Sequence, residues 1–322
     1  MTNIKNSFLI LSITILILTE SCLPKINTSN PSFEKIPDAF GNSKDTTNTA
    51  GISWKKFFTD SNLIALIDTA IIKNPEANMT LQEIEIASNE VKMRHALLSP
   101  IVKAGGSVGV DKAARYTSEG AGNASTEMTP GHEIPEPLGD FSLGFQANWE
   151  ADIWHKLRNS KKSAVQHYLA TQEGRNFVLT NLVAEIANSY YELLALDKQL
   201  NIIHETVQLQ TNQLEIVKTQ KEAGRATALA IKQFEAQLYY TQSLQNDVEQ
   251  NIVENENKIN FLLGRYPQKI KRDSTSFINH EPANVSAGLP SNLLINRPDI
   301  KQAEHEMQAA GLDILEIVRA HV

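Results

Sequence analysis

Histidines are the residues of this sequence whose spacing comes nearest to a pattern with known chemistry. Four of the eight histidines precede a glutamate, namely His132, His204, His280 and His305. None of these has a second histidine four residues further on, so the helix face that binds zinc in the zinc proteases is missing. The sequence also lacks a phosphate-binding P-loop and a cysteine cluster. We therefore expect no metal, no cofactor and no enzyme activity.

The single cysteine, Cys22, is the other residue with recognisable chemistry. Residues 1–21 contain Lys5 and then an apolar run, Phe8–Leu18, which is too short to span a bilayer and has the length of a signal-peptide core. Cys22 follows this segment and has no cysteine to pair with. The arrangement resembles a bacterial lipoprotein cleavage site, where the thiol is acylated, for example with palmitate. The alternative is an ordinary signal peptide followed by an incidental cysteine.

The composition and net charge of the chain indicate which kinds of partner it can bind. The chain has 322 residues, 41% of them hydrophobic, which is ample material for a folded core. Its formal net charge is −7 and it has no basic cluster, which argues against nucleic acid as a partner. Residues 22–53 are rich in Asn, Ser, Thr and Pro and show no periodicity, so we predict a lipid-anchored tether there.

A helical hairpin over residues 157–264 is the largest predicted element. Each limb repeats apolar residues every seven positions along two seams, as a coiled coil does. Gly224 suits the end of the outgoing helix, Thr227 can cap the return helix, and Gly264 ends it. The outgoing seams are Leu179, Ile186, Leu193, Leu200, Val207 and Leu214, and Leu182, Ser189, Leu196, Ile203, Gln210 and Val217; the return seams are Ile231, Leu238, Gln245, Ile252 and Ile259, and Phe234, Thr241, Val248, Asn255 and Leu262.

Two segments before the hairpin have the two-residue period of strands, and we predict strands over residues 101–115 and 140–153. The second strand has the length and alternation of a transmembrane strand, and the first alternates more weakly. A soluble antiparallel sheet with one wet face has the same period. The long polar loop predicted over residues 115–139, followed by a very long helix, favours the membrane. The predicted membrane-facing residues are Phe141, Leu143, Phe145 and Trp149.

The remaining segments suggest an internal repeat. Residues 54–264 form a first repeat that begins with helices over residues 63–98, broken at Asn74-Pro75. Residues 265–290 are predicted to be a linker. Residues 291–322 then begin a second repeat, since Arg297-Pro298-Asp299 occupies the place of Asn74-Pro75-Glu76. We expect this second repeat to be truncated before its own strand pair.

Several motifs, in order and spanning about residues 54–320, resemble the TolC-like outer-membrane efflux channels, and specifically their lipoprotein branch (NodT/OprM-like). At His155 the family commonly has glycine, which leaves the strand-to-helix turn open to a different conformation. Near Leu229 the family often has aspartate, where Ala230 stands here. The motifs are Trp149-Glu150-Ala151-Asp152-Ile153-Trp154, Ala187-Asn188-Ser189-Tyr190-Tyr191, Ala223-Gly224, Leu262-Leu263-Gly264, Gly288-Leu289-Pro290, and Arg297-Pro298-Asp299-Ile300 with Ala303-Glu304.

The resemblance implies a fold that is mainly α with a small β part, equal to half of an α-barrel/β-barrel protomer. It implies a homotrimer in the outer membrane with a large periplasmic portion, in which the helix from Glu76 stacks end to end with the return helix. It also implies a passive export duct of a tripartite pump, whose partners are a periplasmic adaptor (membrane fusion) protein and an inner-membrane transporter. The adaptor would contact the hairpin tip at Lys221, Gly224, Arg225, Ala226 and Thr227.

Three alternatives stay open at this point. The channel could belong to a type I protein secretion system, or the chain could be a non-functional truncated remnant. A different class is a periplasmic coiled-coil adaptor or structural protein, which would also have a helical hairpin. An adaptor needs glycine-rich lipoyl-like halves around that hairpin, and the sequence shows none.

Overall fold

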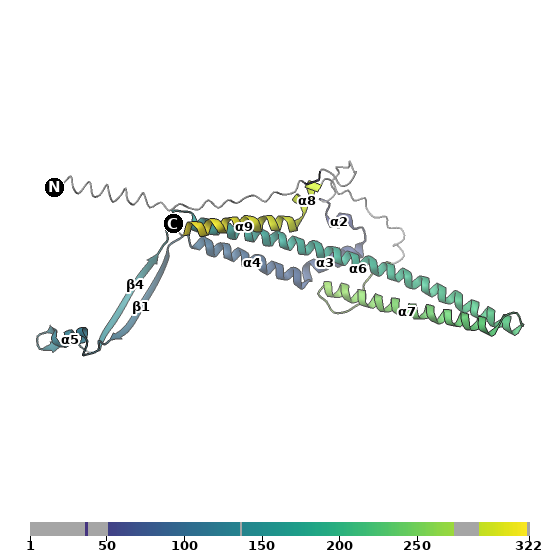
Figure 1. Cartoon of the computed structure of the whole chain (residues 1–322), viewed down its shortest axis with the longest axis horizontal. Helices are drawn as coiled ribbons and strands as arrows, with labels where there is room; N and C mark the ends of the chain where they lie inside the picture. The colour runs from purple at the N-terminus through teal and green to yellow at the C-terminus, as the bar shows by residue number, and fades with distance from the viewer. Residues whose placement is uncertain (1–35, 38–50, 136, 274–289, 321–322) are drawn as a thin grey trace. The chain divides into compact units, whose positions relative to one another are not determined.

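The computed structural model describes residues 36–37, 51–135, 137–273 and 290–320 (Figure 1). The predicted signal peptide, Cys22, most of the predicted tether and residues 274–289 of the predicted linker lie outside the described residues. The predictions made for those segments therefore stay predictions.

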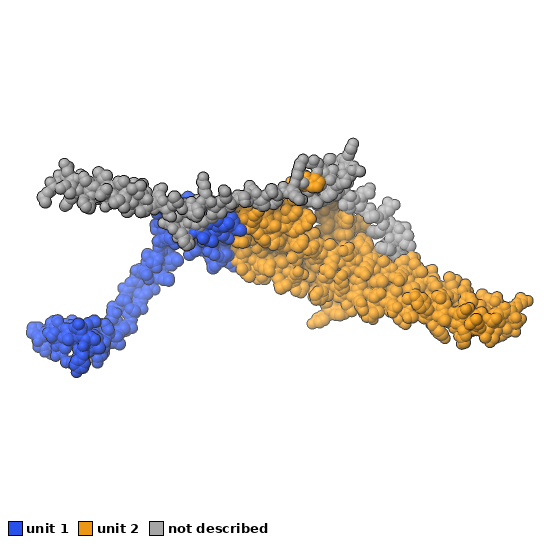
Figure 2. Space-filling model, viewed as in Figure 1, with its two compact units in different colours: residues 1–23, 89–164, 310–322 blue, residues 24–88, 165–309 orange. Residues whose placement is uncertain are grey.

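The chain divides into two compact units (Figure 2). The unit within residues 89–164 and 310–320 holds the strands, and the unit within residues 36–88 and 165–309 holds the hairpin. The fold is mainly helical with a small β part, as predicted. Its helices are α2 (Trp54–Phe57), α3 (Ser61–Lys73), α4 (Pro75–Ala96), α5 (Ser118–Ser125), α6 (Lys156–Glu222), α7 (Ala228–Leu262), α8 (Pro290–Asn296) and α9 (Pro298–Ala320), and its strands are β1 (Ile101–Asp111), β2 (Glu127–Thr129), β3 (His132–Glu133) and β4 (Leu138–Asn148).

The predicted hairpin is formed by α6 and α7, which lie side by side (Figure 1). Every residue of the four predicted seams is buried or half-buried, including the polar ones. The amide of Asn255 on α7 donates to the carbonyl oxygen of Ser189 on α6 at 3.1 Å, so these two polar seam residues face each other. The heptad prediction is therefore confirmed residue by residue.

The main hydrophobic core lies where α3 and the beginning of α4 pack against α6 and α7. Its members are fully or nearly fully buried, and each large aliphatic side chain contributes roughly 1.5–3 kcal/mol by leaving water. The residues of this core are Leu63, Leu66, Ile67, Ala70, Ala77, Leu182, Ile186, Ala187, Tyr190, Leu193, Leu194, Ile259, Leu262, Leu263 and Ile270.

Tyr190 gives this core one polar anchor. Its ring is fully buried, and its hydroxyl donates to a carboxylate oxygen of Asp60 at 2.7 Å. The same carboxylate caps α3 by accepting from the backbone N–H of Asn62 at 2.8 Å. Burial, and then the bond to Asp60, raise the pKa of the Tyr190 hydroxyl above its ordinary value, so this side chain stays a neutral donor. The Tyr190 of the predicted family motif is thus a packing and anchoring residue.

Asn74 joins the ends of three helices. Its backbone N–H donates to Ala70 at the end of α3 at 2.8 Å, and its side-chain oxygen accepts from the N–H of Ala77 in α4 at 2.9 Å. Its side-chain nitrogen donates to the carbonyl oxygen of Leu262, the last residue of α7, at 2.8 Å. The beginning of α4 therefore meets the end of α7, which confirms the expected end-to-end stacking.

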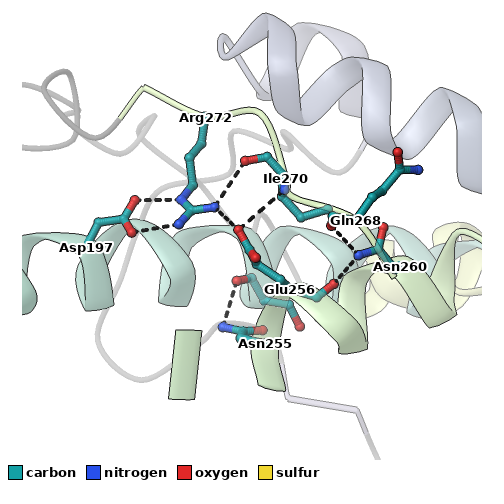
Figure 3. Close-up of polar contacts among 8 residues, drawn as sticks. Asp197, Asn255, Glu256, Asn260, Gln268, Ile270 and Arg272 are labelled. Carbon is teal, nitrogen blue, oxygen red and sulfur yellow. Dashed lines mark hydrogen bonds and ion pairs between the residues drawn. The ribbon is translucent and has the colours of Figure 1, made fainter. Parts of the chain in front are cut away.

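The chain after α7 is fastened to the hairpin by Arg272 (Figure 3). Its guanidinium binds both carboxylate oxygens of Asp197, at 2.6 and 2.8 Å, and also contacts Glu256. These hydrogen bonds to Asp197 and Glu256 raise the pKa of Arg272 above its ordinary value. Ile270, two residues earlier, lies in the hydrophobic core. Within residues 265–273, the described part of the predicted linker, Ile270 and Arg272 therefore hold the chain against α6 and α7, while Tyr266 is exposed.

The two glycines that end the hairpin helices differ in one respect that can be tested. Both have positive φ, +73° at Gly224 and +63° at Gly264. A methyl group at Gly264 would lie 2.7 Å from the backbone oxygen of Lys73, whereas one at Gly224 would meet nothing within 4 Å. We expect Gly224→Ala to cost about 1–2 kcal/mol for the left-handed backbone alone. Gly264→Ala should cost about 1–3 kcal/mol more, because the end-to-end junction must open.

Denaturant unfolding of the two variants measures this difference in the free energy of unfolding. Equal losses for the two variants would contradict the close approach of α7 to α3 at Gly264.

Candidate functional site

The strand pair consists of β1 and β4, which run antiparallel in an unbroken register from Ile101 opposite Asn148 to Asp111 opposite Leu138. Both strands exist where predicted, but each ends earlier than expected, since the predicted ranges were 101–115 and 140–153. The chain leaves β1 after Asp111 to enter the segment that contains α5. Trp149, predicted to lie within the second strand, is the residue that directly follows β4.

The register places all the apolar alternation on one face of the strand pair. Phe141 lies opposite Val108, Leu143 opposite Gly106, and Phe145 opposite Ala104. These side chains are open to solvent in the single chain: Leu143 is 93% exposed, Phe145 84% and Phe141 75%. Exposed apolar surface on a two-stranded sheet is unfavourable in water, because nothing offsets its hydration. This face therefore requires an apolar environment.

The opposite face of the strand pair is polar except at its two ends, where Ile101 and Leu138 lie. The hydroxyls of Ser107 and Ser142, which lie opposite each other, are 2.7 Å apart and hydrogen-bonded. Ser107 stands between Gly105 and Gly109, a spacing that α/β-hydrolases use for a nucleophilic serine. That motif needs a sharp strand-to-helix turn, whereas Ser107 lies in the middle of a regular strand. The pattern here reflects small residues on a polar sheet face.

The segment between β1 and β4 is not a simple loop, and this prediction was wrong. It contains α5 and the short antiparallel pair β2–β3 (Figure 1). The side chain of Thr117 caps α5 by accepting from the N–H of Gly120 at 3.2 Å. Gly120 is buried so close to the carbonyl of Ala114 that any side chain would collide with it. Tight local packing rather than helix propensity forms this helix, so composition alone gave no sign of it.

The turn from β4 into α6 is built by residues of the Trp149–Trp154 motif. The indole N–H of Trp149 donates to the carbonyl oxygen of Leu98 at 3.2 Å. The carboxylate of Asp152 accepts from the backbone N–H groups of Leu157 and Arg158, at 2.9 and 3.0 Å, and so caps α6. His155 has a φ of +62°, the conformation that glycine adopts without strain. The turn thus has the backbone of a glycine-containing turn although the residue differs.

At the other end of α6, the hairpin tip closes with a regular capping motif. The N–H of Gly224 donates to Lys221 at 2.9 Å and that of Arg225 to Gln220 at 2.7 Å, which is the Schellman arrangement. Thr227 then caps α7 through its hydroxyl and the N–H of Ala230, at 3.2 Å. Of the five predicted contact residues, Ala226 is half-buried and the other four are exposed. The structure brings all five together in one tight turn.

One feature of the hairpin escaped the sequence prediction. Ile202, Leu209 and Ile216 of α6 are spaced by seven residues and are 53%, 63% and 56% exposed. They form a third apolar seam on α6, outside the two that face the core. Its signal was present in the sequence, because the same seven-residue count that found the inner seams also finds this one.

The described residues contain no group of three or more His, Cys, Asp and Glu side chains that could hold a metal ion. A helix long and apolar enough to cross a membrane is likewise absent from the part of the chain that the structure describes.

A family model described as "Outer membrane efflux protein" matches residues 66–265, from within α3 to just past α7. This chain belongs to the outer membrane efflux protein family. The predicted resemblance is confirmed, and the matched range contains both the strand pair and the hairpin tip. Efflux-family membership had been inferred from six motifs, of which the first four lie wholly within this range.

Curated relatives in the efflux family include cation efflux system protein CusC of Escherichia coli. It is 27% identical over 273 residues, which cover 85% of this chain and 56% of CusC. Toluene efflux pump outer membrane protein TtgF of Pseudomonas putida is 26% identical over 270 residues, covering 83% of this chain and 53% of TtgF. The chain thus spans about half the length of the curated relatives it matches.

Solved structures agree on the fold. A crystal structure of CusC has a TM-score of 0.70 at 25% identity and covers 88% of this chain and 62% of that one. The open-state MtrE outer membrane channel of Neisseria gonorrhoeae has a TM-score of 0.71 at 19% identity, covering 89% of this chain and 62% of that one. The predicted architecture, a long helical hairpin with a small strand pair, is therefore shown.

The left-handed residue at the strand-to-helix turn allows a test. We expect His155→Gly to raise the free energy of unfolding by about 1 kcal/mol, because glycine adopts positive φ without the steric cost that histidine bears. The exposed contact of His155 with Arg158, at 3.1 Å, offsets little of this gain. Lys156→Gly, at the first residue of α6, is the control and should be destabilising, because glycine loses more conformational freedom in a helix. A less stable His155→Gly protein would mean that the side-chain contact outweighs the backbone strain.

Proposed function

We propose that this chain is a subunit of an outer-membrane channel that exports small molecules or ions, as part of a tripartite efflux pump. The observation that carries the proposal is the strand pair, with one wholly apolar face and one polar face, both exposed in the single chain. A hydrocarbon environment stabilises the first face, and water stabilises the second. Membership of the efflux family and the names of CusC and TtgF, both efflux-system proteins, support this assignment.

In this proposal Phe141, Leu143 and Phe145 face lipid, and Trp149 lies at the membrane interface. Aromatic side chains such as Trp prefer that interface because one part of the ring system is apolar and the N–H is a donor. The helical hairpin extends into the periplasm. Cys22, acylated after removal of residues 1–21, adds a lipid anchor at the start of the mature chain.

Several copies must combine to close the sheet, and we propose a homotrimer. A strand pair with two unpaired edges leaves backbone groups unsatisfied in lipid, so neighbouring strands are needed. The exposed third seam of α6, formed by Ile202, Leu209 and Ile216, offers the hairpin an equivalent apolar contact with a neighbouring helix.

The proposed mechanism is that of a passive duct. A continuous polar surface lowers the barrier for permeants, and no residue needs to form or break a bond. The energy for transport comes from an inner-membrane transporter, coupled through a periplasmic adaptor that binds the hairpin tip at Lys221, Gly224, Arg225, Ala226 and Thr227.

Two neighbouring residues of β4 provide a matched test of the membrane face. Leu143→Lys places a charge on the apolar face, which costs about 2–4 kcal/mol near the middle of a bilayer. In a Cys22→Ala background, which lacks the proposed acyl anchor, we expect this variant to be lost from carbonate-washed outer membranes. Ser142→Lys introduces the same charge on the polar face and should leave membrane retention unchanged. Equal retention of both variants, or release of the parent protein by carbonate alone, would overturn the membrane assignment.

The hairpin tip can be tested at Gly224. Gly224→Pro removes the N–H that bonds to Lys221 and forbids the positive φ, so we expect export and cross-linking to the adaptor to be lost while the protein still reaches the membrane. Gly224→Asn keeps the N–H and tolerates positive φ, and should retain both activities. Normal export by the Gly224→Pro variant would exclude the tip as the adaptor contact.

A further inference from the structure

Charge is unevenly distributed along the polar face of the strand pair. The first cross-strand pairs, at the end joined to α4 and α6, include Lys103 opposite Gln146. The last pairs, at the end joined to α5, include Asp140 opposite Gly109 and Asp111 opposite Leu138. Within β1 and β4, Lys103 is the only basic residue and these two aspartates are the only acidic ones. All three charges lie on the same face.

Lys103 is not neutralised by its surroundings. Its side chain is exposed, and among the described residues it forms no ion pair. Its cross-strand partner Gln146 is neutral, and the next pair along the face, Gly105 opposite Gly144, has no side chains. Asp140 lies opposite Gly109, six residues after Lys103 on β1. At the rise of a strand, Lys103 and Gly109 are roughly 20 Å apart. That separation exceeds the screening length of about 8 Å at physiological salt, so the two ends act independently.

We propose that Lys103 shifts the charge preference of the channel toward anions at the end of the strands joined to α4 and α6. When the apolar face lies in lipid, the opposite face lines the aqueous passage, and each copy contributes one Lys103 to a cationic collar. Asp140 and Asp111 form an acidic collar at the other end of the same strands. The Lys103 collar favours small anions over small cations, because a low-dielectric wall concentrates the field of its ammonium groups in the passage. This proposal rests on the proposed function as an outer-membrane channel.

The two glycines beside Lys103 strengthen its influence. Because Gly105 and Gly144 present only backbone to the passage, no neighbouring side chain covers the ammonium group on that side. A permeating ion therefore passes the charge with only water between them. The flexible stem of lysine lets the ammonium group extend away from the strand toward that ion.

The experiment measures ion selectivity in planar lipid bilayers containing the protein purified from outer membranes. The reversal potential under a KCl gradient gives the ratio of potassium to chloride permeability. We expect Lys103→Gln to change this ratio about twofold toward potassium, the size expected for a screened charge acting across a water-filled passage. Lys103→Glu should shift it further in the same direction. Lys103→Arg keeps the charge at the same position and should leave the ratio unchanged.

A rescue variant tests whether the face, rather than the residue alone, matters. Gln146→Lys, combined with Lys103→Gln, returns a cation to the polar face in the same cross-strand pair, and should restore the parent ratio.

The outcomes separate this proposal from the one it rests on. Open channels in which Lys103→Gln and Lys103→Arg have the same permeability ratio would overturn the role of Lys103 and leave the channel function standing. Failure of the double variant with Gln146→Lys to restore the ratio in open channels would also contradict a collar on this face. Absence of any conductance from the parent protein, together with its release by carbonate, would overturn the channel function itself.

Discussion

The side-chain amide of Asn74 is the contact on which the helical part of the molecule depends. It begins α4 and binds the last carbonyl group of α7, while the backbone N–H of the same residue ends α3, with each bond between 2.8 and 2.9 Å. The negative end of the α7 dipole therefore meets the positive end of the α4 dipole, which is the favourable arrangement. Gly264 makes the approach possible, because a side chain there would strike the backbone of Lys73. Two helices that are separate in sequence thus continue one another along the face of α6.

Apolar residues of the same kinds are buried in the helical hairpin but exposed on the strand pair. The period with which they recur differs between the two. In the four predicted seams of α6 and α7, leucine and isoleucine recur every seven residues and are buried or half-buried between the two helices. In β4, phenylalanine and leucine recur every two residues and stay fully exposed on one face. A helix can bury its apolar stripe against one neighbour, whereas a two-stranded sheet has nothing of its own to cover either face. The exposure of Leu143 therefore supports the proposal that this face of the strands lies against lipid.

The sequence predicted those elements that depend on residue preferences within a few positions of the chain. The heptads, the break at Asn74-Pro75 and the glycine at Gly224 each express a preference that can be read within a few residues. The contact of Arg272 with Asp197 joins positions 75 residues apart, and no periodicity connects them. The helix α5 depends on the absence of a side chain at Gly120. A glycine in a segment rich in small polar residues predicts a loop, so the composition did not indicate this helix. At His155 the sequence departs from the family pattern while the backbone keeps the glycine-like conformation, so residue identity alone pointed to a different turn.

The third seam of α6 and the edges of the strand pair both lack a partner among the described residues of the chain. A helix that belonged only to a two-stranded hairpin would need a single apolar surface, yet Ile202, Leu209 and Ile216 give α6 a second one. The strand pair likewise has two edges whose backbone groups have no partners among the described strands. Both surfaces are satisfied by neighbours of the same geometry, a helix beside a helix and a strand beside a strand. In the proposed homotrimer, repetition of this chain around an axis supplies both at once, and the proposed passage takes its charge from the polar side chains, such as Lys103, that the register turns inward.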